Sequence, residues 1–116
     1  MPVTWELVID CADADRTADF WCAALGYRRF GTAGQYRSAV PEQGSGPKLI
    51  FQAVHEPKTV KNRLHIDVLT ADIESEAQRL SHLGGHRAHN EPISEYGTQW
   101  IVMHDPEGNE FCVCQM

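Results

Sequence analysis

Alternating polar and apolar side chains make residues 63–68, near the middle of the chain, the stretch best suited to chemistry. If this stretch is a strand, successive side chains point to opposite faces. The two faces are Leu64, Ile66 and Val68 on one side, and Arg63, His65 and Asp67 on the other. An imidazole can bind a metal ion or act as a general base, and a guanidinium can anchor a carboxylate or phosphate. The polar face is therefore interpreted as part of a binding site.

The opening of the chain repeats this pattern. Residues 5–10 also alternate between polar and apolar faces, and aligning them with the central stretch places Glu6 opposite His65. At the same offset, the Gly-Tyr-Arg sequence of 26–28 matches the Gly-His-Arg sequence of 85–87. The chain is therefore predicted to be an internal duplication, with an acid and an imidazole at equivalent positions of its two halves.

The elements that must position these side chains follow the same order in each half. An apolar stripe over 17–25 predicts a helix that begins at Asp13 or Asp15 and stops at Gly26, and a second helix should begin at Asp72. The predicted strands are 3–11, extended pieces from 27 onward, 35–40 and 48–54, then a strand ending near 70, a weak strand near 87–89, 99–104 and 110–115. This order predicts an α+β fold of two βαβββ modules in tandem. At 116 residues, the modules should share one domain over 1–116, the first about 1–56 and the second about 61–116.

Composition excludes several classes of partner. The net charge of −6 argues against nucleic-acid binding, and the chain has no signal peptide and no apolar run long enough to span a membrane. The four cysteines lack the C-x-x-C spacing, which favours reduced thiols in a cytoplasmic protein over a disulfide framework. His82, His86 and His89 are expected to be solvated.

Three further motifs give the chain a family resemblance. They are Asp-Phe-Trp through Leu-Gly-Tyr in 19–27, Lys-Asn-Arg-Leu-His-Ile-Asp in 61–67, and Asp-Pro-Glu-Gly-Asn in 105–109. With the duplication, they resemble the glyoxalase/bleomycin-resistance/extradiol-dioxygenase superfamily, also called vicinal oxygen chelate, and within it a small glyoxalase-like branch. The resemblance implies that the two modules form a curved mixed-sheet cup with helices outside. Many members bind a divalent metal such as Ni, Zn, Mn or Fe at four positions that face into the cup.

Those four positions transfer to this chain one at a time. The first-strand position falls on Glu6, the central-strand position on His65, and the last-strand position, usually Glu, on Cys112. The position that ends the first module falls on either Phe51 or Gln52. A thiol is a soft donor, and a phenyl ring is no donor at all, so a complete metal tetrad is not expected.

The resemblance therefore implies a cup for a small-molecule ligand in which the metal tetrad of the relatives is incomplete. It assigns no cofactor and no catalytic residue outright. The predicted ligand pocket is Glu6, Gln52, Arg63, His65, Asp67 and Cys112. The alternatives are a lyase or isomerase with a divalent metal on Glu6 and His65, a metal-independent enzyme with one of these two as general base, and a protein that sequesters its ligand as bleomycin-resistance members do. Exposed sheet edges and the family resemblance favour a homodimer.

Overall fold

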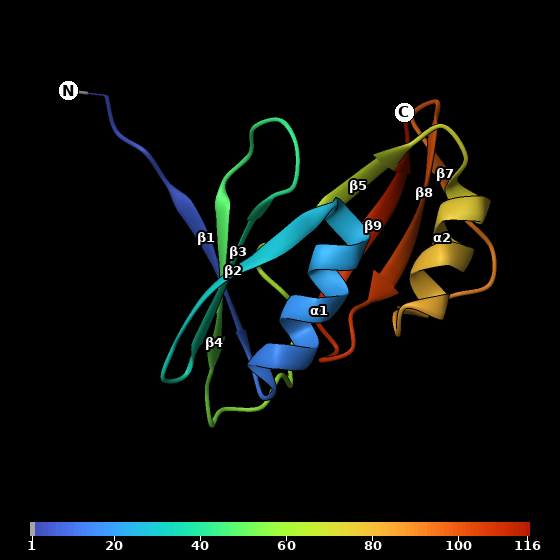
Figure 1. The fold of residues 1–116 in the computed structure, drawn as a ribbon. Coiled ribbons are helices and arrows are strands. Elements are labelled where there is room, and N and C mark those ends of the chain that lie inside the picture. The colour runs from blue at the N-terminus through green and yellow to red at the C-terminus, as the bar shows by residue number, and fades with distance from the viewer. Residues whose placement is uncertain (1) are drawn as a thin grey trace. The chain divides into compact units, whose positions relative to one another are not determined.

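The computed structural model describes residues 2–116 and divides into two compact units, Met1–Lys58 and Thr59–Met116 (Figure 1). Each unit has a strand, then a helix, then further strands that close one mixed sheet. The fold is therefore α+β with two βαβββ modules in tandem, as predicted.

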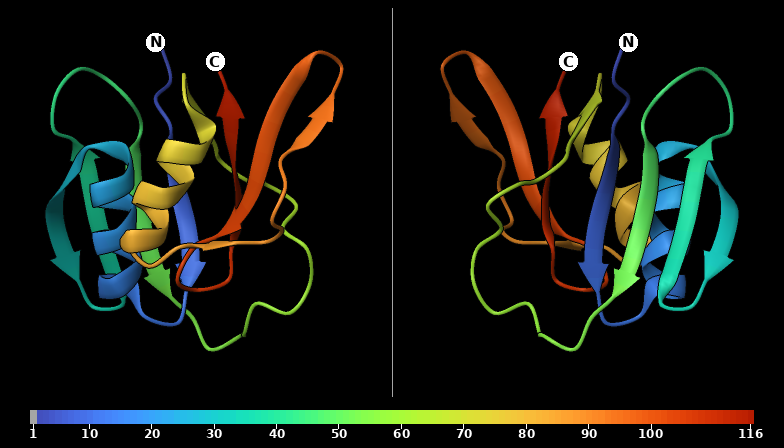
Figure 2. Two further views of the ribbon diagram at one scale, coloured as in Figure 1. Left: turned by 90° about the vertical axis from the view of Figure 1, so that its right-hand side faces the viewer. Right: turned by 90° about the vertical axis from the view of Figure 1, so that its left-hand side faces the viewer.

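The first unit builds a four-stranded sheet in the order β1-β4-β3-β2. Its elements are β1 (Glu6–Cys11), α1 (Ala14–Leu25), β2 (Tyr27–Ala33), β3 (Tyr36–Pro41) and β4 (Lys48–Ala53). Strands β1 and β4 pair in parallel, and the other neighbours are antiparallel. Helix α1 lies against one face of the sheet (Figure 2), which leaves the opposite face without a helix from this unit.

Helix α1 has the ends that the sequence predicts. The Asp13 side chain accepts a hydrogen bond of 3.0 Å from the backbone N–H of Arg16 and caps the N-terminus. Gly26 ends the helix in the left-handed region, at φ 71°, where a side chain would be strained. Between these ends the apolar stripe is buried, and the rings of Phe20 and Trp21 meet edge to face at 5.1 Å.

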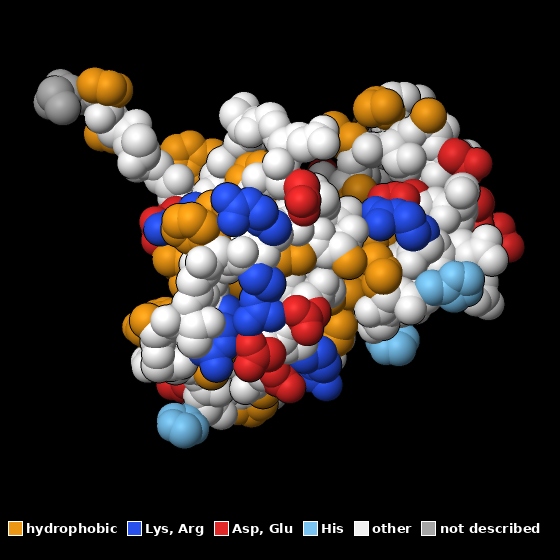
Figure 3. Space-filling model, in the orientation of Figure 1, with side chains coloured by type: hydrophobic (Ala, Val, Ile, Leu, Met, Phe, Trp, Pro, Cys, Tyr) orange, Lys and Arg blue, Asp and Glu red, His pale blue; other side chains and the backbone are white. Residues whose placement is uncertain are grey.

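Charged groups also tie α1 to the sheet, and side chains of both signs gather over this helix in Figure 3. Arg29 on β2 contacts Asp15 at 2.6 Å and Asp19 at 2.7 Å, both on α1. Arg37 on β3 contacts Asp15 at 2.8 Å. The carboxylates are more than half exposed, so the network orients the helix more than it stabilises the fold.

The second unit builds a five-stranded sheet in the order β5-β9-β8-β6, with β7 also paired to β8. Its elements are β5 (Asp67–Thr70), α2 (Ile73–His82), β6 (His86–Arg87), β7 (Ile93–Glu95), β8 (Thr98–His104) and β9 (Glu110–Gln115). Asp72 caps α2 by accepting from the backbone N–H of Ser75 at 3.1 Å, as predicted. The buried face of α2 packs on β8, β9 and β6.

The central strand is shorter than the alternating pattern predicts. Strand β5 begins at Asp67 rather than at Arg63, and Leu64, expected to bury, is 71% exposed. Val68 is buried as expected, so the alternation holds only from the point where the strand pairs with β9. The short strand β7 was not predicted.

Two further features concern membrane-spanning helices and disulfide bonds. None of the helices in residues 2–116 is both long and apolar enough to cross a membrane. The four cysteines, all within this range, form no disulfide.

Candidate functional site

The structure of strand β4 shows which of Phe51 and Gln52 faces away from the core. Phe51 is fully buried at 0% exposure and shares the helix-covered face with Leu49. Gln52, one residue on, therefore points to the other face. There its amide Nε2 donates to the hydroxyl of Tyr36, its cross-strand neighbour, at 3.3 Å. The position that ends the first module thus presents an amide, and Phe51 belongs to the core.

Glu6 lies on the same open face of the first sheet as Gln52. In the parallel register, Glu6 pairs with Lys48, and alternation along β4 puts Lys48 and Gln52 on one side. The Glu6 carboxylate lies 3.7 Å from the Lys48 ammonium group. Glu6 is therefore engaged with a cation from its own unit.

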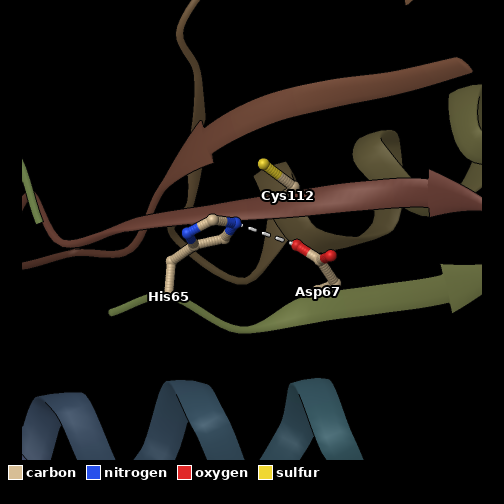
Figure 4. A group of neighbouring side chains, drawn as sticks. All are labelled: His65, Asp67 and Cys112. Atoms are coloured by element: carbon tan, nitrogen blue, oxygen red, sulfur yellow. Dashed lines mark ion pairs between the residues drawn. The ribbon is translucent and has the colours of Figure 1, made fainter. Parts of the chain in front are cut away.

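The open face of the second sheet, the one opposite helix α2, holds three side chains that could bind a metal ion. Asp67 on β5 sits directly opposite Cys112 on β9, and His65 lies just before β5. In Figure 4 the side chains of His65 and Asp67 point toward each other, and that of Cys112 lies beside them. The imidazole Nε2 of His65 is 3.1 Å from Asp67 Oδ1, and one ligand atom from each of the three residues lies within 4.8 Å of the others. We call His65, Asp67 and Cys112 the donor cluster.

The segment that carries His65 is held by strand β9. The Glu110 carboxylate accepts from Lys61 Nζ and from the backbone N–H of Asn62, each at 2.8 Å. The amide oxygen of Asn62 in turn accepts from the backbone N–H of Glu110 at 3.0 Å. At the other end of the segment, the carbonyl of Ile66 accepts from the backbone N–H of Cys112 at 3.0 Å. His65 is therefore fixed from both sides although it is outside the strand.

Burial keeps the nearby thiols protonated. Desolvation, and after it the negative charge of Asp67, raises the pKa of Cys112 above its usual range. The same two causes raise the pKa of Cys114 to about 11. Cys114 lies two residues beyond Cys112 on the same strand face, as the Cys-x-Cys spacing indicates. Neither group is an activated nucleophile near neutral pH.

Arg63, a predicted pocket residue, is exposed in a bend just before His65, and the side chain that contacts Asp67 is His65. Sequence reasoning missed Glu110 and Asn62, which hold the cluster, because their contacts join segments far apart in the chain.

A family model described as the glyoxalase-like domain matches residues 6–114. The chain belongs to the glyoxalase-like family. The match spans both βαβββ modules, so the family assignment applies to the duplicated fold as a whole. A search of curated proteins found no match.

Solved structures agree with this fold. A glyoxalase/bleomycin resistance protein/dioxygenase from Nocardioides is 16% identical, with a TM-score of 0.74 over 99% of this chain and 83% of its own. The fosfomycin resistance protein FosX from Mesorhizobium loti is 14% identical, with a TM-score of 0.72 over 100% and 93%. A FosX variant from Listeria monocytogenes, in complex with Mn(II) and 1S,2S-dihydroxypropylphosphonic acid, is 11% identical, with a TM-score of 0.76 over 98% and 90%. At these identities the likeness concerns the fold alone.

The donors of this glyoxalase-like chain do not fit the metal tetrad that the family resemblance implies. The four corresponding positions are Glu6, Gln52, His65 and Cys112, which supply one carboxylate, one amide, one imidazole and one thiol. Manganese and iron(II) sites favour oxygen and nitrogen donors, and a thiol selects softer ions. The carboxylate is also paired with Lys48.

Proposed function

We propose that this glyoxalase-like protein binds a small molecule on the open faces of its sheets and does so without a complete tetrad of metal ligands. The observation that carries the proposal is the mixed character of the open face of the second sheet. Polar groups of the donor cluster lie there beside apolar ones, among them Leu69, which is 62% exposed next to Cys114. Ligand sites typically combine apolar lining with a few placed polar groups.

The His65–Asp67 pair gives this face its chemistry. If the imidazole Nε2–H donates to the Asp67 carboxylate at 3.1 Å, the other ring nitrogen is left as an acceptor for a ligand hydroxyl or acid proton. Exposed Arg63, two residues before His65, supplies a cation that suits a carboxylate or phosphonate. We infer a small ligand with an acidic or hydroxyl group and an apolar body.

A metal-dependent lyase or isomerase with Glu6 and His65 as ligands is the weaker alternative. To bind the metal, Glu6 would have to give up its contact with Lys48. The amide of Gln52 would likewise have to give up its hydrogen bond with Tyr36. An enzyme that uses the His65–Asp67 pair as general base would differ from a sequestering protein only in that it converts the bound ligand to a product. Product formation in the presence of a chelator would favour that enzyme over sequestration.

The test is a thermal-shift screen of small carboxylates, phosphonates and aromatic acids, run in a chelator so that metal binding does not contribute. A ligand that binds only the native state stabilises it by about 2.7 kcal/mol at a hundredfold excess over Kd. We expect a saturable shift that is lost in His65→Gln. The matched control is His82→Gln, an exposed histidine at the end of α2, which should retain the shift. No saturable shift, or one that His65→Gln leaves intact, would contradict the proposal.

We further propose that the protein is a cytoplasmic homodimer. Reduced cysteines support the compartment, and the strands at the ends of each sheet, β1 and β5 among them, support self-association through edges or neighbouring surfaces. Sedimentation at micromolar concentration tests the dimer, and a mass of 13.0 kDa, that of a single chain, would exclude it.

A further inference from the structure

We propose that the second unit binds a thiophilic divalent cation, such as Zn(II), through His65, Asp67 and Cys112 alone. The proposal rests on the proposed function in that it uses the same sheet face. It differs from the metal tetrad of the family resemblance, which would draw on Glu6 and Gln52 of the first unit. Asp67 has no place in that tetrad, and Cys112 replaces its usual carboxylate.

The backbone places two of the three ligands before any metal is present. Asp67 and Cys112 are directly opposed in the parallel β5–β9 register, so their side chains leave the sheet on one face. His65 is fixed two residues upstream by the bond between the Ile66 carbonyl and the Cys112 N–H. The site needs no folding of a loop around the ion, because strand pairing has already brought the donors together.

The distances allow coordination after small side-chain rotations. The three ligand atoms lie within 4.8 Å of one another. Two ligands of a tetrahedral zinc at 2.0–2.3 Å from the metal are about 3.5 Å apart. The gap of about an ångström can close by rotation of side chains that border solvent, because those of His65 and Asp67 are 43% and 52% exposed.

The donor types determine which ion fits. A thiolate, an imidazole and a carboxylate form a ligand set known for zinc, and three protein ligands leave one position open. The thiolate disfavours Mg(II), Ca(II) and Mn(II), which prefer oxygen. Binding replaces the Cys112 S–H bond with an S–metal bond and releases the proton to solvent. The cation also takes over the contact that His65 now makes with Asp67.

The test uses Co(II) as a spectroscopic probe of the full-length chain, in a buffer without chelator and with a non-coordinating reductant. We expect a thiolate-to-cobalt charge-transfer band that saturates at one ion per chain and disappears when Zn(II) is added. Cys112→Ser should abolish the band, and His65→Gln and Asp67→Asn should each weaken cobalt binding by about tenfold or more. Far-UV circular dichroism of each variant establishes that it is folded.

Two matched controls separate this site from its alternatives. Cys114→Ser removes the neighbouring thiol, and Glu6→Gln removes the ligand that a tetrad across both units would need; both should bind cobalt as the parent chain does. A missing band, a band that survives Cys112→Ser, or binding that Glu6→Gln weakens as much as His65→Gln would overturn the proposal. Because the small-molecule screen is run in chelator, its result is independent of this one.

Discussion

Glu110 is the residue whose removal should most directly loosen the segment that carries His65. Its carboxylate accepts from the backbone N–H of Asn62 at 2.8 Å and from the Lys61 ammonium at 2.8 Å. The Glu110 side chain is only 15% exposed, whereas that of Lys61 is 77% exposed. Glu110→Ala should therefore destabilise the second unit chiefly by leaving the Asn62 N–H without its acceptor.

The expected magnitude follows from the type of bond. A hydrogen bond to a charged group contributes about 1.5–3 kcal/mol, and the bond from Asn62 is partly buried. We assign about 2 kcal/mol to its loss in Glu110→Ala. Glu110→Gln keeps an oxygen that can accept from Asn62 but loses the charge, which roughly halves the strength of such a bond, so it should cost about 1 kcal/mol. Lys61→Ala removes only an exposed ion pair and should change little.

Urea unfolding measures these differences. With a urea m-value of about 2 kcal/mol per molar, a loss of 2 kcal/mol lowers the midpoint by about 1 M. Amide hydrogen exchange adds a local readout, since the N–H of Asn62 should exchange faster in Glu110→Ala than in Glu110→Gln. The cobalt affinity of Glu110→Ala should also fall, because His65 is then held from one side only.

Two results would refute this reasoning. One is an unchanged urea midpoint in Glu110→Ala, which would mean that the Asn62–Glu110 bond adds no net stability. The other is a Lys61→Ala variant as unstable as Glu110→Ala, which would assign the effect to the ion pair.

Three other predictions concern single residues. Hydrogen bonds from Arg37, and after it from Arg29, lower the pKa of Asp15 in the folded protein. The stabilising contribution of Asp15 is therefore present above its pKa in the unfolded chain and is lost as the pH falls through its pKa in the folded protein. In acid titrations, the difference in unfolding free energy between the parent protein and Asp15→Asn should therefore vanish. Phe51→Ala should lower the unfolding free energy by about 3–5 kcal/mol, whereas Gln52→Ala should change it by less than about 1 kcal/mol in urea titrations. Because the pKa of Cys114 is raised to about 11, its alkylation, followed by peptide mass spectrometry, should keep accelerating above the pH at which ordinary thiols level off.

The helices were predictable because their signals are local. Asp13 and Asp72 cap their helices through backbone groups three residues away, and Gly26 supplies the left-handed conformation at a helix end. Periodicity and end residues within one segment contain this information. The order of elements, and with it the βαβββ duplication, follows from the same signals.

The start of the central strand was not predictable from alternation. Residues 63–66 alternate as a strand does, yet Leu64 is exposed and the ladder begins at Asp67. The segment is instead held by Glu110, a residue from the last strand of the chain. Alternation describes which side chains share a face, but it does not say whether a partner strand extends far enough to pair with them.

His89 shows the same limit for side chains in loops. It was expected to be solvated, but its Nε2 accepts from the backbone N–H of Val102 at 3.1 Å. Its other ring nitrogen contacts the carbonyl of Glu91, so the two bonds together require the neutral ring with the proton on Nδ1. The imidazole satisfies a backbone donor of β8 in the gap between β6 and β7. Such a role depends on where two short strands stop, which no local pattern indicates.

The two modules place equivalent residues at equivalent positions, but the donor cluster found among residues 2–116 lies in the second. By the internal repeat, Val8 corresponds to Asp67, and Val8 pairs with Ile50 where Asp67 pairs with Cys112. The first module therefore has the apolar pair Val8 and Ile50 where the second has a carboxylate and a thiol directly opposite each other, with an imidazole beside them. The duplication explains why Glu6 and His65 could be assigned to equivalent positions from the sequence. The divergence between the copies explains why the chemistry should be sought in one of them, and why a metal bound there should not depend on Glu6.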